Sequence, residues 1–223
     1  MQSNQQPREK KQHSISGKLQ VHHAWETIQG EGPFAGTPAV FFRLTGCNLQ
    51  CPFCDTDYTS ERQLLTVEQC LTKIRSIRFS GLVVLTGGEP MRQNVAPLCH
   101  ELIRNGYQPQ IETNGTIYVD GLPSMEVVCS PKVPKLDVGM CAVVTAWKYV
   151  VAADHVDPTD GLPTSTLGGP RPCRPTNSSQ VYVQPMDEGN EERNKRHIDA
   201  AVASCLKYGY RLCLQTHKLI GLE

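Results

Sequence analysis

Three cysteines in one short loop of this 223-residue chain could hold an iron–sulfur cluster. Cys47, Cys51 and Cys54 form a C-x3-C-x2-C array. A structural zinc ion takes four protein ligands, whereas three clustered thiolates suit a [4Fe-4S] cluster that keeps one iron open. An open iron can chelate the amino and carboxylate groups of S-adenosylmethionine and pass an electron to its sulfonium, which releases a 5′-deoxyadenosyl radical. The spacing favours this radical chemistry, with zinc as the alternative.

A second motif, GGEP at residues 87–90, follows a Val- and Leu-rich run that predicts a buried strand. Two glycines remove the Cβ atoms that would keep the backbone away from a ligand, and a carboxylate can receive an ammonium group. Such a turn is a weak signal by itself. Together with the three-cysteine loop it resembles the radical S-adenosylmethionine superfamily, in which this motif holds the methionine amino group of the cofactor.

The overall composition favours a small substrate. Lys and Arg together number 22, as do Asp and Glu, so the chain has no broad basic surface for nucleic acid. No apolar signal segment and no run long enough to span a bilayer is present, which predicts no membrane partner. Ten cysteines in such a chain are expected to be reduced thiols, which indicates a cytoplasmic protein.

The chain alternates between predicted strands and helices. Residues 1–17 are polar and aperiodic, which predicts a disordered tail, and residues 18–223 are expected to form a single domain. Polar residues follow the apolar runs at one end, as in parallel α/β barrels, but there are too few units for eight. We therefore expect an α/β fold, a trimmed, open parallel barrel of about six strand–helix units with the site at the C-terminal ends of the strands. Predicted strands cover residues 18–24, 38–45, 82–86, 110–115, 126–132, 146–151, 181–186 and 211–217, and predicted helices cover 66–77, about 92–104 and 191–208.

Three segments carry more specific expectations. Residues 25–33 read as a Gly-punctuated loop with two carboxylates, and residues 154–180, rich in Pro, Gly, Ser and Thr, read as a long loop that is either a lid or filler. Arg43 interrupts an apolar strand and needs a partner or a ligand. The helix over residues 191–208 is expected to place Ile198, Ala201, Val202 and Leu206 on its core side.

From Trp25 to the C-terminus, the chain resembles one family. The matching motifs are TIQGEG at 27–32, FRL at 42–44, the cluster loop through Thr56, TGGEP at 86–90, IETNG at 111–115, SPK at 130–132, VQPM at 183–186 and QTHK at 215–218. On these motifs the chain resembles the 7-carboxy-7-deazaguanine synthase family. The resemblance implies a lyase that converts 6-carboxy-5,6,7,8-tetrahydropterin into 7-carboxy-7-deazaguanine with loss of ammonia, in queuosine-type biosynthesis. It also implies a [4Fe-4S] cluster, S-adenosylmethionine and Mg²⁺ as cofactors, a homodimer, and a one-electron reductant such as flavodoxin.

The resemblance assigns roles to individual residues. Thr56 is expected to bind Mg²⁺, a hard cation that takes oxygen ligands, and no side chain is assigned a catalytic role beyond the cofactor radical. The cluster ligands are Cys47, Cys51 and Cys54. S-adenosylmethionine is expected at Phe53, Gly88, Glu89, Ser130, Pro131, Lys132, Gln184 and Met186. Substrate is expected at Ile28, Gln29, Gly30, Glu31, Arg43, Thr86, Glu112, His217 and the main-chain carboxylate of Glu223.

Side-chain chemistry bears on several of these substrate assignments. Glu31 and Glu112 are natural acceptors for the guanidine-like edge of a pterin, and Arg43 can bind a carboxylate through two hydrogen bonds. Each of these charges could instead belong to an internal ion pair. His217 could contact the substrate or only order the C-terminal segment.

Two other functions remain open at this point. A small radical S-adenosylmethionine activase acting on a protein glycine would need a groove for a polypeptide and no Mg²⁺ site at Thr56. A non-enzymatic iron–sulfur or zinc module would leave the GGEP turn, the loop at residues 27–32 and the polar strand ends without a role. Turnover of the pterin distinguishes all three functions.

Overall fold

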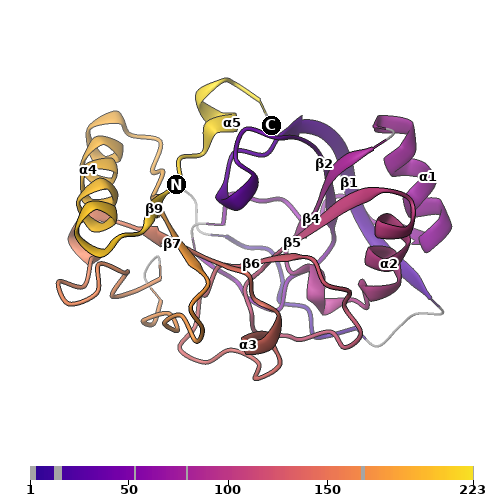
Figure 1. Ribbon diagram of the computed structural model, residues 1–223, viewed down its shortest axis with the longest axis horizontal. Helices are drawn as coiled ribbons and strands as arrows, with labels where there is room; N and C mark the ends of the chain where they lie inside the picture. Colours follow the sequence, from indigo (N-terminus) through magenta and orange to yellow (C-terminus); the bar gives the residue numbers. More distant parts are fainter. Residues whose placement is uncertain (1–3, 13–16, 53, 79, 167–168, 223) are drawn as a thin grey trace.

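One curved sheet organises the protein. The computed structural model describes residues 4–12, 17–52, 54–78, 80–166 and 169–222. Within these residues, nine strands form one sheet in the order β3-β1-β2-β4-β5-β6-β7-β8-β9 (Figure 1). The β1–β2 and β1–β3 pairs are antiparallel, and all pairs from β2 to β9 are parallel. The sheet does not close on itself, so the predicted α/β fold with an open parallel barrel is confirmed.

The elements mostly agree with the predicted ranges. The strands are β1 (Lys18–Ile28), β2 (Pro38–Leu44), β3 (Gln63–Thr66), β4 (Gly81–Gly87), β5 (Tyr107–Thr113), β6 (Glu126–Cys129), β7 (Ala146–Val151), β8 (Gln180–Pro185) and β9 (Arg211–Leu212). The helices are α1 (Val67–Ile77), α2 (Ala96–Arg104), α3 (Met140–Val143), α4 (Glu191–Tyr208) and α5 (Thr216–Leu219), with 3-10 turns at Gly32–Phe34, Pro90–Arg92 and Ala153–His155. Helices of eight or more residues follow β3, β4 and β8, whereas irregular segments make up most of the other connections.

Successive side chains along the strands alternate between an apolar face and a polar face of the sheet. On β4, Val83 and Leu85 belong to the main core, whereas Thr86 lines a cavity on the opposite face. The parallel register places Arg43 of β2 directly beside Thr86. Since successive side chains point to opposite faces, one strand contributes both to the core and to the site.

The helices cover the apolar face at its two ends. Figure 1 shows α1 and α2 beside each other at one end of the sheet and α4 at the other. The predicted capping box at the start of α1 is confirmed: the Thr66 hydroxyl accepts from Gln69 N, and the Gln69 side chain accepts from Thr66 N. Among the described helices, none combines the length and apolar character needed to cross a bilayer.

The predicted core side of α4 is wrong for two of its four residues, and a third, Val202, is only half-buried. Ala201 is buried as expected, but Ile198 is 41% exposed and Leu206 is 83% exposed. The other buried residues of the helix are His197 and Ser204. His197 Nδ1 accepts a hydrogen bond of 2.9 Å from Ala153 N, and Ser204 Oγ donates to Gly161 O. The connection between β7 and β8 therefore packs on a polar stripe of α4, which hydrophobic periodicity does not detect.

Two strand boundaries also differ from the predictions. β1 continues to Ile28, because residues 24–28 pair with β2, so the predicted loop begins only at Gln29. At the other end of the chain, β9 has only two residues, and His217 lies in α5 rather than in a strand. Both differences move site residues, because Ile28 lies at a strand end and His217 on a helical turn.

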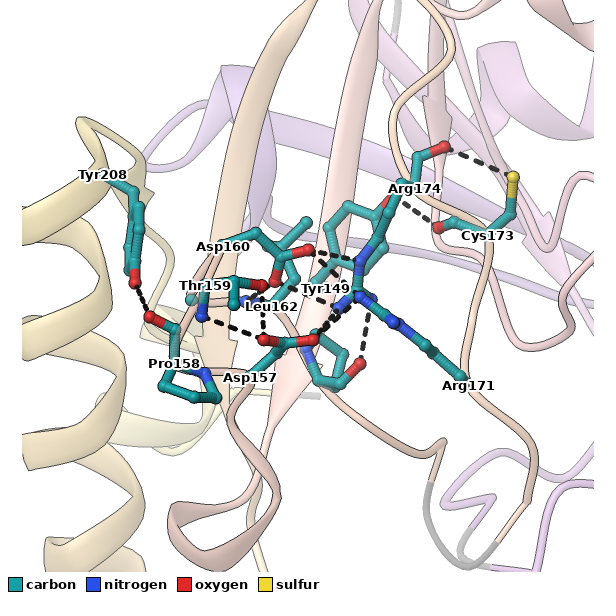
Figure 2. Close-up of polar contacts among 12 residues, drawn as sticks. Tyr149, Asp157, Pro158, Thr159, Asp160, Leu162, Arg171, Cys173, Arg174 and Tyr208 are labelled. Atoms are coloured by element: carbon teal, nitrogen blue, oxygen red, sulfur yellow. Dashed lines mark hydrogen bonds and ion pairs between the residues drawn. The ribbon is translucent and has the colours of Figure 1, made fainter.

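The Pro-rich segment is held by ion pairs on the outside of the barrel (Figure 2). Arg174 makes two hydrogen bonds to the Asp160 carboxylate, at 2.7 and 3.0 Å, and Arg171 contacts Asp157 at 2.8 Å. The Tyr208 hydroxyl of α4 donates to Pro158 O. None of the described residues between 154 and 180 lines the cavity. Together with the ion pairs, this favours a structural connection between β7 and β8 over a lid on the cavity.

Candidate active site

The polar face of the sheet borders a cavity of about 520 Å³. This volume lies within the range of roughly 300–1,000 Å³ that is usual for small-molecule sites. The cavity collects side chains from the ends of parallel strands, as the fold class predicts. The predicted residues that line it are Ile28, Gln29, Glu31, Arg43, Cys47, Cys51, Cys54, Thr56, Thr86, Gly88, Glu112, Ser130, Lys132, Gln184, Met186 and His217.

Other predicted residues are not part of the cavity lining. Gly30 packs against α5, where an added Cβ would collide with the His217 ring, so glycine is required for this close approach. Pro131 is buried beside its lining neighbours Ser130 and Lys132. Glu89 is likewise absent from the lining. Phe53 and Glu223 were also predicted to bind ligands and lie outside the described residues.

Glu89 links the C-terminal ends of β4 and β5 through hydrogen bonds. It is fully buried, and its carboxylate accepts hydrogen bonds from Met91 N at 2.9 Å, Thr113 Oγ1 at 2.8 Å and Asn114 N at 2.7 Å. Burial raises its pKa to about 7, although these hydrogen bonds act in the opposite direction. The GGEP turn is thereby tied to the end of β5, and the predicted contact between Glu89 and the cofactor stays a prediction.

The three loop thiols lie at one end of the cavity. Burial raises the pKa of Cys47 to about 12 and also raises the pKa values of Cys51 and Cys54, so the unligated thiols are neutral. All ten cysteines are free thiols. In the described part of the chain, no three His, Cys, Asp or Glu side chains converge on one metal ion. A four-iron cluster does not require such convergence, because each thiolate binds a different iron.

The surroundings of the thiols suit a [4Fe-4S] cluster with S-adenosylmethionine beside it. A Cβ on Gly88 would collide with Gly46 O and lie 2.7 Å from Cys47 Cβ, so the GGEP backbone packs directly against the cluster loop. Ser130 and Lys132 also lie together, with Lys132 Nζ donating to Ser130 Oγ at 2.6 Å. Burial lowers the pKa of Lys132. These groups would hold a cluster and a charged cofactor side by side.

The fit to Mg²⁺ rests on a single hydroxyl. Thr56 Oγ1 lines the cavity and lies 3.4 Å from Asp55 Oδ1. Mg²⁺ usually keeps several waters and takes one or two protein oxygens together with substrate oxygens. The Thr56 hydroxyl suits this pattern, with the remaining ligands coming from substrate and water.

Residues 4–12 run along the cluster loop, in contrast to the disorder predicted for residues 1–17. Gln6 Nε2 donates to Thr56 O at 2.9 Å, and Gln6 Oε1 accepts from Tyr58 N at 2.9 Å. Glu9 N donates to Cys47 O at 2.7 Å. The polar composition of this segment suggested disorder because its hydrogen-bond partners lie about 40 or more residues away and are invisible to local pattern. We call residues 4–12 the N-terminal clamp.

The cluster loop is fixed on its other side by the end of β5. Asn114 Nδ2 donates to Asn48 Oδ1 at 3.1 Å, and Asn48 Nδ2 donates to Thr116 Oγ1 at 2.7 Å. At the cavity rim, Lys218 of α5 contacts Asp55 at 3.2 Å. The loop therefore owes its position to segments that are distant in sequence.

A buried ion triplet also lines the cavity. Lys148 Nζ of β7 contacts the carboxylates of Glu31 and Glu112, the latter at 3.4 Å. Burial alone would raise the pKa of Glu31, but the Lys148 charge and hydrogen bond outweigh burial and hold it at about 2. Burial likewise acts against the Lys148 ammonium, yet the Glu112 and Glu31 charges raise its pKa above the ordinary value. Glu31 and Lys148 are therefore both charged at neutral pH.

Arg43 stands on the cavity face of β2 and stacks on an aromatic ring. Its guanidinium carbon lies 4.6 Å from the centre of the Trp25 ring on β1. Trp25 in turn contacts Phe41, with ring centroids 5.5 Å apart. Stacking limits the orientations of the guanidinium, and the planar donor group of an arginine matches the geometry of a carboxylate.

Sequence reasoning missed Lys148. The residue interrupts the apolar run at 146–151 just as Arg43 interrupts the run at 38–45, so the same signal was available. Asn114 and Lys218 also line the cavity and were not predicted. Both belong to motifs that were recognised, but nothing local indicated that their side chains reach across to the cluster loop.

Comparisons with known proteins agree with this geometry. Residues 42–125 match the family model described as Radical SAM superfamily. The chain is 45% identical over 218 residues to 7-carboxy-7-deazaguanine synthase from Rhodospirillum rubrum, covering 92% of each protein. It is 37% identical over 218 residues to the Rickettsia prowazekii enzyme of the same name, covering 92% of this chain and 89% of that one.

A solved structure supports the fold. The crystal structure of QueE from Escherichia coli matches with a TM-score of 0.68 at 23% identity, covering 91% of this chain and 99% of that one. At this identity the match bears on the fold alone. The long alignments to the two bacterial relatives, together with the radical SAM match, show that the chain belongs to the 7-carboxy-7-deazaguanine synthase family.

Proposed function

We propose that this chain catalyses the radical ring contraction of 6-carboxy-5,6,7,8-tetrahydropterin to 7-carboxy-7-deazaguanine with release of ammonia. The observation that carries the proposal is one cavity lined both by three loop thiols and by charged groups suited to a pterin, with Arg43 for its carboxylate and with Glu31 and Glu112 for its N–H donors. A cavity of about 520 Å³ with this lining has space for a cofactor and a small substrate. The reaction makes the protein a lyase of 7-deazapurine biosynthesis.

The cofactor end of the cavity is assigned to the cluster and S-adenosylmethionine. When bound, these groups supply a 5′-deoxyadenosyl radical that abstracts hydrogen from C6 of the pterin. Cys47, Cys51 and Cys54 would hold the cluster. Gly88, Ser130, Lys132, Gln184 and Met186 line the cavity where S-adenosylmethionine is proposed to bind, and Phe53, Glu89 and Pro131 remain proposed contacts.

The substrate end is assigned to the pterin. Arg43 would bind the pterin carboxylate, and Glu31 and Glu112 would accept hydrogen bonds from the amino and ring N–H groups. Thr56 would contribute a hydroxyl to Mg²⁺ beside the substrate. Ile28, Gln29, Gly30, Thr86, His217 and the main-chain carboxylate of Glu223 complete the proposed substrate contacts. By holding one C–H bond in place and excluding water, these residues would serve the radical step without exchanging protons with it.

We also propose a homodimer, a flavodoxin-like reductant and a cytoplasmic location. The family resemblance supports the first two, and exposed apolar side chains such as Leu206 and Leu219, at 83% and 73% exposure, leave surface for a partner subunit. Ten free thiols suit a reducing compartment. Light scattering at several protein concentrations tests the dimer: a monomer at high concentration would contradict it.

Anaerobic reconstitution tests the function. The protein is loaded with iron and sulfide and mixed with S-adenosylmethionine, Mg²⁺, a one-electron reductant and the pterin. We expect 7-carboxy-7-deazaguanine and ammonia, both absent with a Cys51→Ala variant. Formation of 5′-deoxyadenosine without the deazaguanine would assign another substrate, and absence of 5′-deoxyadenosine would overturn the radical chemistry.

The activase alternative is less well supported. It predicted a groove for a polypeptide, whereas the structure has a cavity of about 520 Å³ that is lined in part by the buried Glu31–Lys148–Glu112 triplet. A glycyl backbone has no carboxylate to engage Arg43. The relatives are also named as synthases of a small molecule.

A further inference from the structure

Lys148 is the least expected charged group of the cavity. It lies on β7, between the apolar neighbours Trp147 and Tyr149 that point into the core, and its own side chain points into the cavity. The side chains of Lys148, Glu31 and Glu112 expose only 9%, 12% and 19% of their surface. Two glutamate side chains and one lysine side chain thus share a site with little water.

Each carboxylate oxygen of the triplet has a donor from the protein. Lys148 Nζ donates hydrogen bonds to Oε2 of Glu31 and to Oε2 of Glu112. Gln215 Nε2 donates to Glu31 Oε1 at 2.8 Å, and Gln29 Nε2 donates to Glu112 Oε1 at 3.0 Å. The carboxylates are therefore fixed in place before any ligand arrives. Glu112 Oε1 also accepts a hydrogen bond from Gln110 Nε2 at 3.2 Å, so a second lone pair for a ligand N–H remains on both Glu31 oxygens and on Glu112 Oε2.

We propose that Lys148 is a positioning residue, whose ammonium holds the carboxylates of Glu31 and Glu112 side by side so that both can accept hydrogen bonds from the donor edge of the pterin. The proposal rests on the proposed function, because it assumes that a pterin occupies this end of the cavity. Lys148 then acts through the two carboxylates rather than on the reacting atoms. Its ammonium supplies the positive charge that permits two anions in one buried site.

The reasoning follows from what the carboxylates would do without the ammonium. Two carboxylates that share a buried site cannot both remain ionised near neutral pH, and one of them takes up a proton. A protonated carboxyl presents an O–H donor, which would face the N–H donors of the pterin. Binding would then improve as the pH rises and the second carboxylate ionises. In the native protein, the Glu31 pKa of about 2 keeps this group ionised throughout the neutral range.

Other titratable groups also face the triplet. Lys132 from the loop after β6, Cys213 from the segment after β9 and His217 from α5 all interact electrostatically with Glu31 or Lys148. These groups are present in the native protein and in a Lys148 variant alike. Their effect on binding is therefore removed by comparing the two pH profiles.

The test measures substrate affinity rather than turnover. Cluster-loaded protein with S-adenosylmethionine, but without reductant, is equilibrated anaerobically with the tetrahydropterin by dialysis between about pH 6 and pH 8.5. Native protein, Lys148→Met and Lys148→Arg are compared, with the exposed Lys135→Met as a matched control. We expect the native, Lys148→Arg and Lys135→Met profiles to agree in shape. For Lys148→Met, the affinity should fall by roughly tenfold per pH unit below the raised carboxylate pKa.

The outcomes separate the proposal from its alternatives. A Lys148→Met profile parallel to that of the native protein, whether weaker or not, would overturn the proposal and indicate direct contact or simple packing. If Lys148→Met loses its cluster or its fold, Lys148→Gln removes the charge with a polar side chain and is held to the same criterion. Failure of the native protein to bind the pterin at any pH would instead refute the proposed function.

Discussion

The residues that line the cavity are positioned in two different ways. At the substrate end, Arg43, Glu112 and Lys148 stand on β2, β5 and β7, and the strand register sets where their side chains point. At the cofactor end, the three thiols lie on an irregular loop that is held by Gln6 of the N-terminal clamp and by Asn114 after β5. One end is positioned by the sheet and the other by long-range hydrogen bonds.

This difference predicts how the two ends respond to change. Groups on strands keep their place when a neighbour is altered, because the backbone ladder and the core beneath them persist. A loop has no such ladder, so the loss of one distant contact can release it. Variants at the substrate end should therefore alter substrate affinity and leave the cluster intact. Variants of the clamp should do the reverse.

The largest effect is expected from the thiols. Cys47→Ala, Cys51→Ala or Cys54→Ala should abolish the brown [4Fe-4S] chromophore, because each removes one iron ligand. Absorption spectra and iron content after anaerobic reconstitution measure the result. Cys173→Ala, which alters a thiol outside the cavity lining, should leave both unchanged. A chromophore that survives loss of a loop thiol would show that the cluster assignment is wrong.

Arg43→Lys should raise the KM for the pterin by roughly tenfold to a hundredfold. An ammonium cannot reproduce the planar two-donor edge of the guanidinium. The loss of one hydrogen bond to a charged group costs about 1.5–3 kcal/mol, which corresponds to this range. The cluster spectrum should be unchanged. Steady-state kinetics at saturating S-adenosylmethionine measure the effect, with the exposed Arg75→Lys as control. An unaltered KM would mean that Arg43 does not bind the substrate carboxylate.

Gln6→Ala should speed the loss of iron to a chelator by several-fold. The Gln6 side chain bonds to Thr56, Tyr58 and Thr59, and each such hydrogen bond contributes about 1 kcal/mol. Bleaching of the chromophore after addition of the chelator gives the rate, and pterin affinity should not change. Gln108→Ala, at an exposed position of β5, is the matched control. Equal bleaching rates would show that the clamp does not stabilise the cluster loop.

The smallest effect is expected at Thr56. Thr56→Ala should raise the Mg²⁺ concentration needed for half-maximal turnover by a few-fold, because only one of several oxygen ligands is removed. The chromophore should remain, since the cysteine ligands are untouched. A magnesium titration identical to that of the native protein would rule out Thr56 as a ligand.

Local sequence was sufficient for the family, the fold class and most of the cavity. The three-thiol spacing, the GGEP turn and the apolar runs each depend on residues within about ten positions of one another. Strand alternation then indicated that polar residues follow the strand ends, and these residues do line one cavity. The same reasoning found Arg43, because a charge inside an apolar strand is informative wherever the strand lies in the sheet.

Only the tertiary structure decided how these pieces meet. Lys148 joins Glu31 and Glu112, which lie 117 and 36 residues away in sequence, and that meeting depends on the order of strands in the sheet. The sequence of the N-terminal clamp suggested disorder because the hydrogen-bond partners of Gln6 lie 50 and 52 residues away in sequence. Local patterns report which face of an element is apolar, whereas the pairing of buried charges and the anchoring of loops depend on contacts that form only when the whole sheet is assembled.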